Sequence, residues 1–173
     1  TGFYSAKVAE DDDGRFFIED LQATGVDFHT VAANAASASA GITGKCLVMV
    51  TDDAERTMNT FLGANLDLTS NEVDESALIN SDWLYLEGYL VTDDARTNVA
   101  IKAIECAKAN RVKTALSLSD PFVVQVFEGN LLKVIGDGVD LLFCNSDEAR
   151  SFTNTHSTEA AAEQLKKYAK TFV

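Results

Sequence analysis

The stretch VKTALSLSDPF, residues 112–122, determines how the rest of the chain is interpreted. Residues 112–118 are mostly apolar or β-branched and too few for a helix, which is typical of a buried strand. Asp120 followed by Pro121 indicates a helix start, because Asp caps a first turn and proline suits the first helical position. We therefore predict a strand over 112–118 and a helix that begins at Pro121.

The same alternation continues on both sides of this stretch. Strands that alternate with helices of about 10–15 residues indicate βαβ units and a parallel sheet with both faces covered. Glycine at position 25 is a typical helix end. Strands are predicted over residues 2–8, 83–87 and 138–144, and helices over 15–23, over 92–109 with Thr92 as cap, from Asn145, and over 157–170 with Ser157 as cap.

The pattern between residues 26 and 63 is different. Residues 30–40 are rich in Ala and Ser and are predicted to form a loop. The runs CLVMVT (46–51) and RTMNTFL (56–62) flank a polar turn, which indicates a β-hairpin. We expect a partial α/β core domain made of residues 1–25 and 64–173, and a small β lid made of residues 26–63 that stands away from the main sheet.

Composition excludes several classes of function. With 46% hydrophobic residues and a single proline, the chain is globular. The formal net charge of −13, from 14 basic and 27 acidic residues, argues against nucleic-acid and anionic-membrane surfaces as partners. Cys46, Cys106 and Cys144 are far apart in apolar runs. We interpret them as buried, reduced thiols of a cytoplasmic protein.

The two ends of the sequence are abrupt. It begins inside a predicted strand, and residues 171–173 lie where the next strand of the alternation is due. We therefore expect this sequence to be an internal fragment of a larger protein.

Four segments carry a further signal through their order and spacing: KVAEDDDG with LQATGV (7–14 and 21–26), TGKCLVMVTDDAERTM (43–58), SLSDPF (117–122) and DLLFCNSDEA (140–149). Together they resemble the ribokinase-like, PfkB-type carbohydrate kinase family, and particularly its adenosine-kinase branch. The first is similar to the family's strand, acidic-glycine turn and helix, and the second to its lid hairpin. The third is similar to the Asn-Leu-Ser-Ala-Pro-Phe stretch of adenosine kinases, and the fourth carries the family's Asn-x-x-Glu motif.

The resemblance implies a fold and an activity. The fold is α/β, a ribokinase-like parallel sheet sandwiched by helices, incomplete here, with a small β lid. The activity is ATP-dependent phosphorylation of a sugar or nucleoside hydroxyl, with an adenosine-like substrate favoured by SLSDPF. ATP and Mg²⁺ are the implied cofactors. The implied partner is the small-molecule substrate, and the sequence leaves open whether two copies of the chain pair through the lid.

Asn145 and Glu148 allow two interpretations. An Asn followed three residues later by Glu, directly after a strand, is a capping box. In the family that this sequence resembles, the same motif shapes the magnesium and phosphate environment, where a carboxylate acts through water on a hard cation. Both roles can hold together.

Three further residues are assigned to substrate binding by resemblance. Glu87 ends a predicted strand at the edge where ligands bind in such sheets, and it is either a sugar contact or an exposed strand-end carboxylate. Arg56 of the hairpin either reaches a ligand when the lid closes or is solvated beside Glu55. Asp12 belongs to an acidic turn at 11–13 that is either solvated or near the sugar.

No catalytic residue is assigned within this sequence. In the resembled family a glycine-rich motif supplies the aspartate base and an anion hole, and we expect that motif beyond Val173. We therefore expect an enzyme whose 173-residue piece is inactive alone. The alternatives are a non-catalytic small-molecule-binding domain of ribokinase-like fold, and a doubly wound protein unrelated to kinases.

Overall fold

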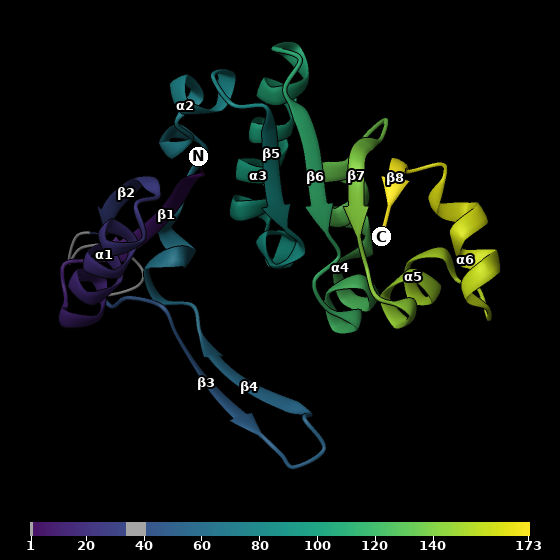
Figure 1. Cartoon of the computed structure of the whole chain (residues 1–173), viewed down its shortest axis with the longest axis horizontal. Helices are drawn as coiled ribbons and strands as arrows, with labels where there is room; N and C mark the ends of the chain where they lie inside the picture. The colour runs from purple at the N-terminus through teal and green to yellow at the C-terminus, as the bar shows by residue number, and fades with distance from the viewer. Residues whose placement is uncertain (1, 34–40) are drawn as a thin grey trace. The chain divides into compact units, whose positions relative to one another are not determined.

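A computed structural model describes residues 2–33 and 41–173 of the chain and divides it into two compact units, Thr1–Leu68 and Thr69–Val173 (Figure 1). The predicted boundary between a core and a lid at residues 26–63 does not coincide with this division, and the assignment of that range to a lid stays a prediction. In the described part of the chain no helix is long and apolar enough to cross a bilayer.

The N-terminal unit begins with a β-α-β unit. Strand β1 (Phe3–Ala9), helix α1 (Asp12–Thr24) and strand β2 (Asp27–Ala33) follow one another, and the two strands pair in parallel along their whole length. Helix α1 ends as predicted at Gly25, whose φ of +71° is the left-handed conformation that glycine adopts without strain. The loop predicted over residues 30–40 is wrong for residues 30–33, which belong to β2. Pairing with β1 outweighs the weak strand propensity of alanine. Residues 34–40 lie outside the described part of the chain.

Asp11 and Thr43 tie three segments of this unit together. Asp11 caps α1 by accepting the Gly14 N–H at 2.9 Å, and it also accepts the Thr43 N–H at 2.9 Å. The Thr43 hydroxyl donates to Asp11 at 2.5 Å and accepts the Ala9 N–H at 2.9 Å. Gly14 leaves room for this contact, because a β-carbon there would lie 2.0 Å from the Ala9 carbonyl oxygen. The end of β1, the start of α1 and the segment before the hairpin are therefore joined.

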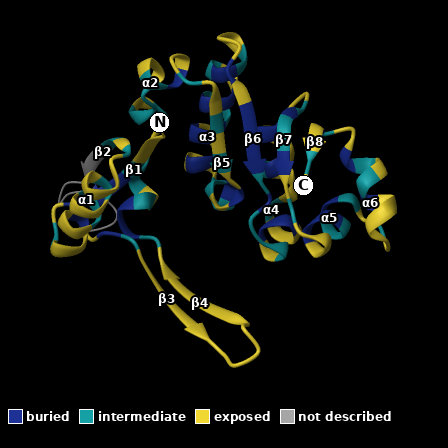
Figure 2. Ribbon diagram, viewed as in Figure 1, coloured by how far each residue is buried: buried dark blue, intermediate teal, exposed yellow. Residues whose placement is uncertain are grey.

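The predicted hairpin is confirmed as a separate two-stranded sheet. Strands β3 (Lys45–Val50) and β4 (Arg56–Phe61) are antiparallel, and all their residues are exposed (Figure 2). The chain then continues into a short 3-10 helix, η1 (Gly63–Asp67). Cys46 is on β3 and is exposed, so the prediction that it is buried is wrong, because an apolar strand is buried only where a second layer covers it. Cys106 and Cys144 are half-buried.

The C-terminal unit contains a four-stranded parallel sheet with the order β5-β6-β7-β8. The predicted alternation of strands and helices and the α/β class are confirmed. The elements are η2 (Ser70–Glu72), α2 (Glu75–Ile79), β5 (Trp83–Glu87), η3 (Gly88–Thr92), α3 (Asp94–Ala109), β6 (Lys113–Ser117), α4 (Pro121–Ile135), β7 (Val139–Phe143), α5 (Ser146–Thr153), α6 (Thr158–Leu165) and β8 (Ala169–Phe172).

Three predicted helix boundaries are wrong. Helix α1 starts at Asp12 instead of Arg15, because Asp11 caps its first turn. Asp93, and not Thr92, caps α3, because its carboxylate accepts the Arg96 N–H at 2.8 Å. Helix α6 ends at Leu165 instead of Lys170, because the chain turns there to enter β8. The strand predicted from residue 171 therefore starts two residues earlier, at Ala169.

The main core lies between this sheet and its helices. Leu116 and Leu142, on β6 and β7, are at most 1% exposed and pack with apolar side chains of α3, α4 and α5. Trp83, Tyr85 and Phe143 share the other face of the sheet and are much more exposed than these two leucines. The buried layer holds the strands in register and so fixes the positions of their ends.

Candidate functional site

The carboxyl ends of β5, β6 and β7 form the candidate site. Parallel strands end at the same edge of a sheet, and ligands of open α/β sheets bind outside that edge. The arrowheads of β5, β6 and β7 lie at one edge of the sheet (Figure 1). Glu87, Ser117 and Phe143 are the last residues of these strands and are aligned with one another across the sheet. The segments that follow them, residues 88–92, 118–120 and 144–145, therefore lie at this edge.

The segment after β5 is in tight contact with the segment after β6. The Gly88 N–H donates to the Ser119 hydroxyl oxygen at 2.8 Å. A β-carbon at Gly88 would lie 2.7 Å from the Leu118 carbonyl oxygen and 2.8 Å from that of Ser117. Only glycine fits here, so the two strand ends are held against each other.

A turn at Ser119 leads from β6 into α4. The φ of Ser119 is +71°, and its N–H donates to the Ser117 hydroxyl at 3.1 Å. Asp120 then caps α4 as predicted, with its carboxylate accepting the Phe122 N–H at 2.7 Å and Pro121 in the first turn.

Asn145 and Glu148 form the predicted capping box at the start of α5. The Asn145 side chain accepts the Glu148 N–H at 2.8 Å. One carboxylate oxygen of Glu148 accepts the Asn145 N–H at 3.1 Å, and the other accepts the Asn145 side-chain amide at 2.9 Å. The capping interpretation is thereby confirmed, whereas the magnesium and phosphate interpretation stays a prediction.

The environment of Glu148 disfavours its charge. The residue is 6% exposed. Burial raises the pKa of its carboxyl group, and the negative charges of Asp120 and Asp147 raise it further, against the opposing hydrogen bond from the Asn145 backbone. A cation near this edge would relieve the repulsion.

These residues fit a hydrated cation better than a directly ligated one. In residues 2–33 and 41–173, no group of three or more His, Cys, Asp or Glu side chains is arranged to hold a metal ion. Each oxygen of Glu148 already accepts one hydrogen bond and can accept another. Magnesium keeps several of its waters in proteins, so a buried carboxylate can act on it through water.

The sequence-predicted site residues lie in both units. Glu87, Asn145 and Glu148 are at the carboxyl edge of the C-terminal sheet. Asp12 and Arg56 belong to the N-terminal unit. The Asp12 side chain is 95% exposed and pairs with Arg15, and Arg56 is exposed at the start of β4. The substrate-binding roles of Glu87, Asp12 and Arg56 stay predictions.

Sequence reasoning did not single out Gly88, Ser117 or Ser119. The signals were available, since a glycine directly follows the strand-end Glu87 and two serines flank Leu118 in SLSDPF. Nothing in the sequence shows that residues 31 positions apart are bonded.

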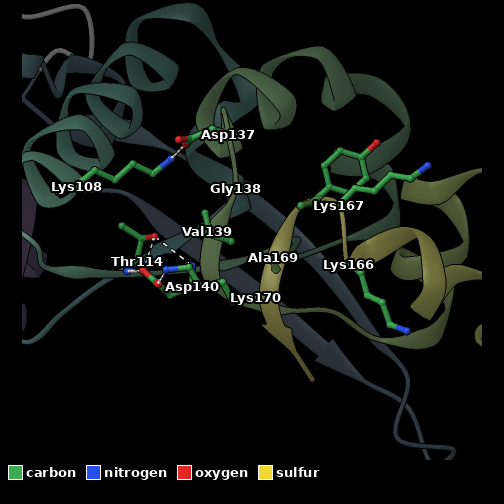
Figure 3. Close-up of a pocket in the computed structure, with 11 residues that line it drawn as sticks. Lys108, Thr114, Asp137, Gly138, Val139, Asp140, Lys166, Lys167, Ala169 and Lys170 are labelled. Atoms are coloured by element: carbon green, nitrogen blue, oxygen red, sulfur yellow. Dashed lines mark hydrogen bonds and ion pairs between the residues drawn. The ribbon is translucent and has the colours of Figure 1, made fainter.

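A groove of about 380 Å³ lies at the opposite, amino edge of the same sheet (Figure 3). Two ion pairs lie within its lining, Lys108 with Asp137 and Lys170 with Asp140. The lining residue Lys166 pairs instead with Glu163, outside the groove. In Figure 3 Lys166 and Lys167 extend away from Lys108, so the lysines do not converge on a common point. We therefore place the candidate site at the carboxyl edge.

The chain is similar to several known kinases. The model of the pfkB family carbohydrate kinases matches residues 2–173. A solved adenosine kinase from Sinorhizobium meliloti is 32% identical, with a TM-score of 0.86 over 96% of this chain. A probable sugar kinase from Rhizobium etli CFN 42 is 30% identical, with a TM-score of 0.88 over the same share. Guanosine-inosine kinase of Escherichia coli K12 is 27% identical over 127 residues, which is 72% of this chain.

The chain spans only part of these relatives. It covers 51% of the adenosine kinase and of the sugar kinase, and 29% of the guanosine-inosine kinase.

Proposed function

The chain belongs to the pfkB carbohydrate kinase family, and we propose that the whole protein transfers the γ-phosphoryl group of ATP to a hydroxyl group of a purine nucleoside. The family membership supports phosphorylation of a sugar or nucleoside. The adenosine kinase and the guanosine-inosine kinase among its relatives favour a nucleoside acceptor. The observation that carries the proposal is the gathering of Glu87, the Ser119 turn and the Asn145–Glu148 box at one edge of a parallel sheet.

Glu87 binds the acceptor in this proposal. It ends β5, and its carboxylate can accept hydrogen bonds from two adjacent sugar hydroxyls at once. Because Gly88 is packed against β6, the backbone that carries Glu87 is fixed before substrate arrives. Pre-positioning of this kind reduces the entropy lost on binding.

Asn145 and Glu148 shape the phosphate side. Mg²⁺, when bound with ATP, neutralises charge on the phosphate oxygens as the phosphoryl group moves. The Asn145 side chain holds the start of α5, and its amide and backbone N–H groups hold the Glu148 carboxylate in place. The Glu148 carboxylate would act on that cation through water.

The N-terminal unit contributes the lid and the remaining contacts. Apolar side chains on both strands of the hairpin, such as Val48 and Met58, are exposed, and we assign them to covering the acceptor or to pairing with the lid of a second copy. For Arg56 on the hairpin and Asp12 at the start of α1 we propose substrate-binding roles. The base is not assigned among these residues, so the 173-residue chain alone is expected to be inactive.

The test uses the full-length protein with magnesium ATP and a panel of acceptors: adenosine, guanosine, inosine, ribose and fructose. ADP formation is measured for each acceptor. We expect the highest kcat/KM with a purine nucleoside, and a Glu87→Ala variant whose acceptor KM rises about tenfold or more. Acceptor binding by calorimetry without ADP formation would instead support the second candidate, a non-catalytic binding domain. Turnover of hexoses alone would contradict the nucleoside assignment.

A further inference from the structure

The turn that ends β6 holds Ser119 in an unfavourable backbone conformation. Its φ of +71° lies in the left-handed region, where a residue with a β-carbon is strained. The Asp120 N–H donates to the Leu118 carbonyl, two residues back, at 2.9 Å. A three-residue turn with positive φ at its centre is a rare and strained γ-turn. Such strain persists only where the surroundings enforce it, and it is concentrated at functional sites.

The turn carries the Ser119 hydroxyl to the end of β5. The ladder between β5 and β6 ends at the pair Glu87 and Ser117. One residue further, the Gly88 N–H has left the ladder and donates to the Ser119 hydroxyl at 2.8 Å. The peptide group that joins Glu87 to Gly88 is therefore fixed by a side chain 31 positions later in the sequence.

All polar groups of Ser119 are hydrogen-bonded, and two of them bond to the segment after β5. Its N–H donates to the Ser117 hydroxyl at 3.1 Å, and its carbonyl accepts the Tyr89 hydroxyl at 3.2 Å. Tyr89 follows Gly88, so Ser119 holds two successive residues of the segment after β5. The strain at Ser119 is thus balanced by contacts that act on the backbone next to Glu87.

We propose that Ser119 is a positioning residue for Glu87. Its hydroxyl orients the peptide after Glu87 and so directs the carboxylate toward the acceptor sugar, while Ser119 itself does not touch substrate. This inference rests on the proposed function, in which Glu87 binds the sugar hydroxyls. Without the hydroxyl, the Glu87–Gly88 peptide loses its acceptor and can rotate. A displacement of about 1 Å at such a group can lower the rate by about a hundredfold.

The experiment is a double-mutant cycle in the full-length protein. Ser119→Ala, Glu87→Ala and the double variant are compared with wild type for kcat, acceptor KM and ATP KM. We expect Ser119→Ala to raise the acceptor KM about tenfold and to leave the ATP KM within about twofold. In the Glu87→Ala background the same substitution should have no further effect, because Ser119 acts through Glu87.

Two further variants separate positioning from folding. Ser119→Gly removes the hydroxyl but relieves the strained φ, so it should be at least as stable as Ser119→Ala and still raise the acceptor KM. If Ser119→Ala does not fold, Ser119→Gly replaces it in the double-mutant cycle with Glu87→Ala. Ser157→Ala is the matched control: Ser157 also accepts a backbone N–H, that of Ala160 at 3.1 Å, at the start of α6. It should leave all three kinetic constants unchanged.

The outcomes distinguish the two proposals. Full-length wild type that phosphorylates none of the acceptors overturns the proposed function, and this inference with it. Active wild type with an unchanged acceptor KM in Ser119→Gly overturns the positioning role alone. Additive effects of Ser119→Ala and Glu87→Ala, or equal increases in both KM values, overturn it as well.

Discussion

Replacing Glu148 by Gln separates a capping role from a role in the magnesium environment. Both carboxylate oxygens accept hydrogen bonds from Asn145, at 3.1 Å from its N–H and 2.9 Å from its side-chain amide. Gln offers one oxygen and one NH₂ group, so it keeps one of these contacts and turns a donor toward the other donor of Asn145. The Asn145 amide cannot flip without losing its own bond, in which Oδ1 accepts the Glu148 N–H at 2.8 Å.

Two opposing effects set the change in stability. A buried donor left without an acceptor costs about 1–3 kcal/mol, and Glu148 is only 6% exposed. Against this, burial and the charges of Asp120 and Asp147 raise the pKa of Glu148, so a neutral side chain is relieved of that repulsion. We therefore expect the free energy of unfolding to fall by no more than about 1–2 kcal/mol.

The change in activity is expected to be larger than the change in stability suggests. If the charge of Glu148 orders magnesium-bound water, Glu148→Gln should lower kcat/KM about tenfold or more, with partial rescue at high magnesium. The assay is a magnesium titration of initial rate in the full-length protein, beside a melting curve. Equal rates of variant and wild type at every magnesium concentration would leave the capping box as the whole role of Glu148.

The chain offers a matched control in a second capping box. Glu72 accepts the Thr69 N–H at 2.7 Å and the Thr69 hydroxyl at 3.2 Å, at the start of η2. This box lies before α2, away from the strand ends that form the candidate site. Glu72→Gln should change the melting temperature slightly and leave the magnesium dependence of the rate unaltered.

The raised pKa of Glu148 gives a readout that needs no substrate. Because its folded-state pKa lies above its ordinary value of 4.5, the folded protein binds the proton more tightly than the unfolded chain. The resulting stabilisation is fully present below that ordinary value and is lost as the pH rises through the folded-state pKa. In urea unfolding at a series of pH values, the free energy of unfolding should therefore fall less steeply with rising pH in Glu148→Gln than in wild type. The same dependence on pH in both proteins refutes this reasoning.

Three more outcomes follow from other contacts. Gly88→Ala should lower the free energy of unfolding by about 1–3 kcal/mol and raise the acceptor KM, because a β-carbon there meets two carbonyl oxygens; a fully stable and fully active variant contradicts the contact. Hydrogen bonds from the hydroxyl and N–H of Thr43 lower the pKa of Asp11 from 3.8 to about 2. The ionised Asp11 therefore stabilises the folded protein fully above pH 3.8, and this stabilisation is lost as the pH falls through about 2. Asp11→Ala should lower the free energy of unfolding by about 1 kcal/mol at neutral pH, and the variant should not lose this stabilisation on acidification, as measured by urea unfolding. The same loss of stability at low pH in variant and wild type would contradict this. Exposed Cys46 should react with a thiol-specific disulfide reagent before Cys144, whose pKa is raised by burial and then by Glu148, and mass mapping that finds Cys144 labelled first contradicts this.

Features set by neighbours in the sequence were predictable. The Asp120–Pro121 helix start and the Asn145–Glu148 box depend on residues at most three positions apart, and both are present. The strands of the C-terminal sheet were predictable for the same reason, since short apolar runs between capped helices have few other structures.

Features set by the surroundings were not. Thr92 and Asp93 can both cap a helix, and the structure favours Asp93 because its carboxylate also pairs with the side chain of Arg96, which is 4% exposed. Cys46 stands in an apolar run, but the run forms a ribbon that is exposed in the described chain. Sequence patterns report which residues prefer burial and not whether another layer covers them.

The candidate site shows the same division within a few residues. That Glu87, Asn145 and Glu148 reach one edge follows from the parallel order of the strands, which the sequence indicates. The bond from Gly88 to Ser119 does not follow from it, because it requires a positive φ at a serine, which local propensity opposes. The strained Ser119 between two strand ends is therefore visible only in the folded chain. It adds to Glu87, the carboxylate that would contact the sugar, a hydroxyl that holds the backbone of Glu87 in place.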